Sequence, residues 1–307
     1  MEDIICQGNS DIMNDYILLC ISIFAYLVGN TIKKTYTTAT HKNNLSLIRY
    51  NLITAFVAFI FFLCFGFRSV SLFTVLLAIA FSIAILMSTF LGLKAFELGP
   101  MSLSTVIISF STVFSALSGA IFYNEVITFS HIIGIILMLL CFVFTVSKDK
   151  NKKSSSIKWL IVCIFASLSS GIIGILQKIH QSSLYKGEIN EFLMLSFLIS
   201  TVISLIILLV SYKKNTVNSN TKENKKQFFF LTGICLISGV AIAINHKLNL
   251  YLSGVFDSAT FFPLVNGSGL ILSTICAIVL FKEKLTKKQW CGLLLGIIAV
   301  IFLCNPF

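Results

Sequence analysis

The sequence predicts an all-α polytopic membrane protein whose ten transmembrane helices form two inverted five-helix repeats. Three observations favour this class. The composition is 57% hydrophobic and only 11% charged, with a mean hydropathy of +0.95. Long uncharged apolar runs recur along the chain, and positive charge is concentrated in alternate loops. Only helices and closed barrels satisfy the backbone in lipid, and these runs are too long for barrel strands.

The ten predicted spans are apolar runs of about 18 or more residues, which cross roughly 30 Å of hydrocarbon at about 1.5 Å per residue. Cutting the chain at its charges places them at 16–32, 50–67, 71–93, 99–122, 126–146, 159–177, 192–212, 228–246, 258–281 and 289–304. The first of these spans is short, and Arg49 blurs the start of the second. Together the spans leave no room for a sizeable soluble domain.

The loops between the spans predict how the chain is divided and oriented. We expect an acidic N-terminal tail (1–15), a first repeat (16–147), a basic cytoplasmic linker (148–158) and a second repeat (159–307). All but four of the 23 positive residues follow odd-numbered spans, the exceptions being Arg68, Lys178, Lys186 and Lys247. The positive-inside rule then places both termini outside the cell membrane. Because the charge lies between spans, the net +11 does not indicate nucleic-acid binding.

The two halves of the chain share a pattern at one constant spacing. Ser111, Ser115, Gly119, Glu125 and Gly134 correspond to Gly269, Ser273, Ala277, Glu283 and Gly292. The loop 126–130 after the first glutamate carries no Lys or Arg, whereas the equivalent loop 281–289 carries four lysines. Each repeat has an odd number of spans, so the second repeat enters the membrane inverted relative to the first.

Short motifs around these loops resemble a known family. They are AFELGP at 95–100, Glu125 with Gly134, NGSG at 266–269, and FKEKLTKKQWCG at 281–292. The chain resembles a ten-helix, EamA-type member of the drug/metabolite transporter superfamily. Its second half is also similar to the last two helices of the small multidrug resistance proteins. The resemblance implies a small-solute transporter, most commonly an exporter.

The sequence departs from these relatives in two ways that matter for mechanism. Small multidrug resistance proteins exchange protons through a glutamate in their first helix, and spans 1 and 6 here contain no acidic residue. Facilitated diffusion and solute exchange are therefore as plausible as proton antiport. Many relatives also carry their first-half positive loops after spans 2 and 4, so this chain is expected to insert the other way round.

Polar residues inside spans are expensive in lipid, so they are candidates for substrate contact. We predict that amide, hydroxyl and imidazole groups line a central cavity suited to a neutral or zwitterionic solute. These residues are Asn30, Ser109, Ser111, Gln177, Asn245, His246, Asn266 and Ser268. Pro263 would kink the helix that carries the last two. The alternative for each residue is helix packing or an interhelical hydrogen bond worth about 1 kcal/mol.

Charged residues at the span ends form a second candidate set. We predict alternating ion-pair gates made by Lys33, Lys94 and Glu97 at the cytoplasmic mouth and by Lys178, Lys247 and Asp257 at the outer mouth. The alternative is that they are ordinary interfacial charges whose stems lie along apolar surface. Glu125 and Glu283 are expected to be structural, capping or orienting the next helix.

The sequence contains no motif for an enzyme, a cofactor or a metal. It has no phosphate-binding loop, no paired acids and no nucleophile with a nearby base. The nine cysteines lie mostly inside spans without CxxC spacing, and the four histidines are scattered. We therefore expect a protein that is not an enzyme and that needs no cofactor.

The function predicted is a secondary transporter that moves a small organic metabolite or amphipathic compound by alternating access, as an exporter. Its partners would be that solute and membrane lipids. The Gly292–Gly296 pair is typical of a close helix contact or of a homodimer interface, so a homodimer stays an open alternative. Two alternatives remain. One is a lipid or polyprenyl-carrier flippase, with Arg49 or Lys94 lining a lateral opening. The other is a non-transporting membrane scaffold.

Overall fold

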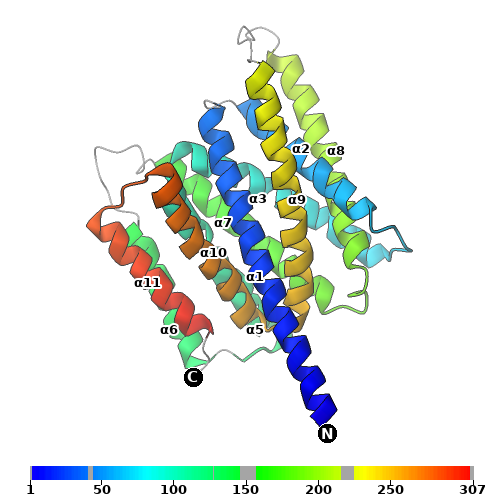
Figure 1. Ribbon diagram of the computed structural model, residues 1–307, viewed down its shortest axis with the longest axis vertical. Helices are drawn as coiled ribbons and strands as arrows, with labels where there is room; N and C mark the ends of the chain where they lie inside the picture. Colours follow the sequence, from blue (N-terminus) through cyan, green and yellow to red (C-terminus); the bar gives the residue numbers. More distant parts are fainter. Residues whose placement is uncertain (1, 41–43, 127, 146–156, 216–224, 305–307) are drawn as a thin grey trace.

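The computed structural model describes residues 2–40, 44–126, 128–145, 157–215 and 225–304. Over these residues the chain is all-helical, as predicted, and contains no strand. Its helices are α1 (Glu2–Ala39), α2 (Asn44–Leu63), α3 (Leu72–Leu98), α4 (Met101–Ile108), α5 (Ser111–Tyr123), α6 (Phe129–Thr145), α7 (Ile157–Gln181), α8 (Ile189–Asn215), α9 (Lys225–Val255), α10 (Ser258–Phe281) and α11 (Lys287–Cys304). Figure 1 shows them as one bundle with both termini at its lower end.

Eight segments are long and apolar enough to cross a membrane, and α4 with α5 counts as one of them. The 17 residues of α6 and the apolar stretch Trp290–Ala299 of α11 are shorter, so the predicted count of ten spans is not confirmed. Large apolar side chains such as Leu72 and Phe229 are exposed on the outside of the bundle. Such a surface suits lipid, and the chain is an integral multi-pass membrane protein.

Several helices extend beyond the predicted spans. α1 begins at Glu2, so nearly all of the predicted tail 1–15 is helical. α9 continues to Val255, nine residues past the predicted end at 246. An apolar run marks only the thickness of the hydrocarbon, whereas a helix continues for as long as its backbone bonds are made. Most of the predicted linker 148–158 lies outside the described residues.

The fourth span is broken between α4 and α5 because its backbone tightens there. The N–H of Phe110 bonds to the carbonyl of Ile107 at 3.2 Å, and the N–H of Val113 bonds to the carbonyl of Phe110 at 3.0 Å. These bonds join residues three apart instead of four, which is the spacing of a 3₁₀ turn. α10 is irregular in its own way, since Pro263 lies inside it and has no N–H to donate.

The helices pair across the midpoint of the chain. α3 packs along α7, α1 along α9, α2 along α8, and α6 along α11. Stacked and tilted aromatic rings join α2, α3 and α8 in the main apolar cluster, including Phe62 against Phe197 and Phe81 against Phe192. Since each of these pairings joins a helix before residue 146 to one after residue 156, neither half buries its apolar faces by itself.

The loop between α7 and α8 is fastened to the start of α3 by Glu188. Its carboxylate accepts hydrogen bonds from the backbone N–H of Ser71 at 3.1 Å and from Ser71 Oγ at 2.9 Å. Burial alone would raise the pKa of Glu188, but hydrogen bonds from Thr74 and Ser71 outweigh it and hold that pKa below its usual range.

We expect Glu188→Gln to remove part of the acid sensitivity of this protein. A carboxyl whose folded-state pKa is depressed contributes stability above its unfolded pKa of about 4.3, and that stability is lost as pH falls through the folded value. Melting temperatures recorded from neutral pH down to acid should therefore fall less steeply for the variant than for the wild type. Parallel curves would contradict this role for Glu188.

Candidate functional site

A cavity of about 120 Å³ lies inside the bundle, between α1, α3, α4, α5, α7, α9 and α10. Its polar lining includes six of the eight residues predicted to contact substrate: Asn30, Ser111, Gln177, Asn245, His246 and Asn266. The other two are not part of the lining. Ser109 is buried, and its hydroxyl donates to the carbonyl of Thr105 at 2.8 Å, whereas Ser268 is half-buried in α10. The part that any of these residues plays in substrate binding stays a prediction.

Helical spacing brings these groups to one place. Tyr26, Asn30 and Lys33 lie four and three residues apart, so they share one face of α1. Ser170 and Gln177 share a face of α7 in the same way. Further polar lining comes from Ser88, Thr89, Ser115 and Asn249, and the apolar part of the wall is made mainly of Ile85, Ile173, Ile242, Phe261, Phe262 and Val265. The site is thus a small chamber with polar groups on an apolar background, which is the usual character of a small-molecule site.

Two carboxamides in the cavity have donors without a partner. Asn30 Nδ2 and Gln177 Nε2 are buried without an acceptor at hydrogen-bond geometry, and their residues are only 5% and 2% exposed. The Asn30 side chain does interact with Tyr26, one turn earlier on α1. His246 Nδ1 is likewise buried and unpaired. Leaving a buried donor unsatisfied costs about 1–3 kcal/mol, so such groups are uncommon unless a ligand uses them.

A neighbouring polar group serves the structure instead. Asn245 Nδ2 donates to the carbonyl of Ser22 at 3.0 Å, and Ser22 Oγ donates to Asn249 Oδ1 at 2.6 Å. These bonds fasten α9 to α1 beside the cavity. Asn245 therefore differs from Asn30 and Gln177, because its amide donor is already occupied.

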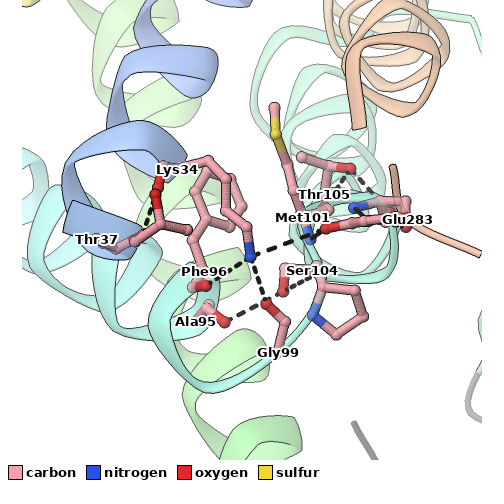
Figure 2. Close-up of polar contacts among 12 residues, drawn as sticks. Lys34, Thr37, Ala95, Phe96, Gly99, Met101, Ser104, Thr105 and Glu283 are labelled. Carbon is pink, nitrogen blue, oxygen red and sulfur yellow. Dashed lines mark hydrogen bonds and ion pairs between the residues drawn. The ribbon is translucent and has the colours of Figure 1, made fainter. Parts of the chain in front are cut away.

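Lys33 also lines the cavity, and its ammonium group forms no ion pair with any carboxylate that the structure describes. The next residue, Lys34, points to a different place. Figure 2 shows Lys34 at the corner between α3 and α4, where its Nζ donates to the carbonyl oxygens of Phe96 at 3.0 Å and Gly99 at 3.1 Å. Glu283 Oε1 lies 3.8 Å from the same nitrogen.

Glu283 joins the two halves at this corner. It follows α10, yet it accepts hydrogen bonds at the start of α4, from the backbone N–H groups of Met101 at 2.6 Å and Ser102 at 3.0 Å, and from Ser102 Oγ at 2.6 Å. Pro100, the N-cap residue of α4, offers no side-chain cap. A carboxylate at a helix N-terminus satisfies free N–H groups and complements the helix dipole. We call Lys34, Glu283 and the α3–α4 turn the first corner.

A second corner has the same design at the opposite end of the bundle, where α5 and α9 end (Figure 1). Lys178 Nζ lies 2.9 Å from Glu125 Oε1 and 3.2 Å from the carbonyl oxygen of Phe256. Glu125 accepts hydrogen bonds from the backbone N–H of Ser258 at 2.9 Å and from Ser258 Oγ at 3.2 Å, at the start of α10. Lys178, Glu125 and the α9–α10 turn form this second corner.

Both glutamates are presented by the same kind of helix ending. α5 and α10 each stop at a residue in the left-handed conformation, Asn124 with φ 55° and Lys282 with φ 51°. The next N–H, that of Glu125 or Glu283, then bonds back to the carbonyl of Gly119 or Ala277. Asparagine adopts this conformation readily, whereas lysine does so at a steric cost of about 1–2 kcal/mol.

The residues predicted as gates lie in several environments. Lys178 belongs to the second corner, and Asp257 directly precedes α10 there. Lys94 pairs with Glu97 in its own helix at 3.1 Å, and Lys247 Nζ lies 3.4 Å from the centre of the Phe65 ring. Lys33 faces the cavity, as described above. A gating role for these residues stays a prediction.

The corner residues Lys34, Glu125 and Glu283 were not predicted as gates. The sequence did indicate the two glutamates as equivalent positions, but it gave no information on which lysine each would meet. Residues 33 and 34 are separated by about 100° around a helix, so adjacent lysines point to different surroundings.

Two other candidate sites offer fewer free polar groups to a solute. A groove between α1 and α9 is lined entirely by apolar residues: Ile21, Phe24, Ala25, Val28, Ile237, Val240, Ala241 and Ile244. Arg49, which the flippase alternative would use, instead donates to the hydroxyl of Tyr212 on α8 at 3.0 Å. Within the part of the chain that the structure describes, His, Cys, Asp and Glu side chains do not gather in threes as a metal site requires.

Comparison with known proteins supports a transporter fold. The model of the EamA-like transporter family matches residues 157–305. Among 28 matching chains of solved structures, one titled "Crystal structure of protein" gives a TM-score of 0.62 at 13% identity, over 94% of this chain and 96% of that chain. At this identity the likeness concerns the fold alone. No curated protein matches the chain.

Proposed function

Because the second half of this chain, residues 157–305, belongs to the EamA-like transporter family, we propose that the protein is a secondary transporter that moves a small organic solute across the cell membrane by alternating access. One observation carries the proposal: the central cavity holds the unpaired donors of Asn30 and Gln177. A packing interface would leave such donors without compensation, whereas a polar solute would satisfy them. A non-transporting scaffold has no use for this cavity.

The arrangement of the halves supports inverted repeats. Helices pair reciprocally, as in α3 with α7 and α1 with α9. The corners are reciprocal as well, because Glu125 of the first half caps α10 and Glu283 of the second half caps α4. Repeats related in this way bind solute between them and expose it to one side at a time.

In this mechanism the two corners close opposite ends of the bundle that contains the cavity. Each corner ties the fourth-span helix of one half to the fourth-span helix of the other, so opening an end requires its lysine–glutamate contact to loosen. The termini lie together at the end opposite the first corner (Figure 1). We propose that this shared end faces outward and that the direction of transport is export, as the loop charges and the resemblance suggest.

We expect Asn30→Leu and Gln177→Met to abolish transport without lowering stability. Each change removes an unpaired donor at nearly constant volume, so the melting temperature should stay constant or rise. The measurement is saturable uptake of amino acids, nucleosides, polyamines and organic acids into proteoliposomes, alongside thermal unfolding of the purified protein.

Asn245→Leu is the matched control for this experiment. Its amide is already bonded to Ser22, so the same kind of change should lower the melting temperature. Full uptake by Asn30→Leu, or no saturable uptake of any panel solute by the wild type, would overturn the proposed function.

A further inference from the structure

Lys33 is a half-buried cation that faces the cavity and has no counter-charge among the described carboxylates. Among lysines inside the described spans, Lys34 and Lys178 each meet a glutamate and at least one backbone carbonyl. Lys94 meets Glu97, and Lys247 lies over the ring of Phe65. Lys33 makes none of these contacts. An ionisable group inside a membrane span is costly, and one that lacks an internal partner indicates a ligand or a transport path.

Two groups that share the cavity with Lys33 are donors that lack acceptors. Asn30 lies one turn before it on α1, and Gln177 faces the same cavity from α7. Both present buried N–H₂ groups that no protein atom accepts from. No Asp or Glu is among the residues that line the cavity. The described lining therefore combines one positive charge with free donors and offers no negative charge.

We propose that the cavity selects organic anions, binding a carboxylate between the ammonium of Lys33 and the amide donors of Asn30 and Gln177. This inference rests on the transport function proposed above and assigns its substrate class. A carboxylate accepts several hydrogen bonds, and bonds from a charged donor are about twice as strong as neutral ones. Its apolar body would lie against Ile85, Ile173, Ile242 and Phe262.

The same charges disfavour other substrates. A polyamine or a cationic dye would meet the ammonium of Lys33 and find no carboxylate, so it would be repelled. A zwitterionic amino acid would place its own ammonium in a chamber with no acidic partner. Unpaired like charges are an effective means of rejecting the wrong ligand. The structure thus favours anions over the zwitterionic or neutral solutes that the amides alone suggest.

The test uses three probes of one shape, namely isovalerate, isovaleramide and isopentylamine, and follows the melting temperature of the purified full-length protein at increasing probe concentration. A ligand that binds the native state raises this temperature by mass action. We expect isovalerate to stabilise the wild type most. Lys33→Met should weaken isovalerate binding by about tenfold or more and leave isovaleramide binding unchanged.

Without ligand, Lys33→Met should melt at a higher temperature than the wild type, because an uncompensated, half-buried charge inside a membrane span is removed. Lys33→Arg keeps the charge and should keep the preference for isovalerate. Lys186→Met, in the exposed loop before α8, is the control and should alter neither quantity.

Three results would overturn the inference: equal or stronger binding of the amide or the amine by the wild type, no binding of isovalerate, or a lower melting temperature for ligand-free Lys33→Met. The proposed transport function fails separately. It survives a failure of the anion preference if a neutral, zwitterionic or cationic solute shows saturable uptake that Asn30→Leu abolishes, and it fails if no solute of the panel, organic acids included, is taken up.

Discussion

Glu125→Gln and Lys178→Met should each lower the free energy of unfolding by about 3–5 kcal/mol, and the double variant should recover most of that loss. The two charges lie 2.9 Å apart, with side chains only 10% and 11% exposed. Removing one partner leaves the other charge buried and uncompensated. Removing both leaves neutral side chains of similar size, which the site accommodates at a smaller cost.

A double-mutant cycle measures this coupling directly, by denaturant or thermal unfolding of the four proteins in detergent. Lys186→Met, at the same end of the bundle but exposed, controls for the loss of a lysine. The equivalent cycle on Lys34 and Glu283 should give a weaker coupling, because that pair is 3.8 Å apart. Additive single losses at Glu125 and Lys178 would contradict the ion pair.

Gly99→Ala should destabilise the first corner by about 1–3 kcal/mol or more. A Cβ at Gly99 would overlap the indole ring of Trp159. That ring is 1% exposed and donates Nε1–H to Ser104 Oγ at 3.0 Å, so it has no free space to move into. Any shift of the turn would also displace the Gly99 carbonyl from Lys34.

Gly92→Ala is the matched control, since a Cβ at this position of α3 meets nothing within 4 Å. Alanine is favoured over glycine inside a helix by up to about 1 kcal/mol, so this variant should be as stable as the wild type or more stable. Melting temperatures of both variants provide the comparison. Equal changes in melting temperature for the two variants would show that the contact with Trp159 does not determine whether residue 99 can carry a side chain.

The class of this protein was readable from its sequence because lipid imposes strict local conditions. An uncharged run must be helical to satisfy its own backbone, whatever surrounds it. The same reasoning singled out Asn30 and Gln177, since a polar group inside such a run is costly wherever the helix is placed. Both residues indeed line the cavity. The helix ends were less well predicted, as for α1, because an apolar run reports the membrane thickness and not the helix length.

The sequence by itself determined the helical membrane class, the approximate spans and which polar residues are out of place in lipid. Only the tertiary structure decided which of the adjacent Lys33 and Lys34 faces the cavity, because that depends on how α1 is rotated against α3 and α7. It also decided that Glu125 caps a helix 133 residues away and not the next one. Hydropathy is a property of each segment, whereas the partner of a buried charge is set by how segments pack together.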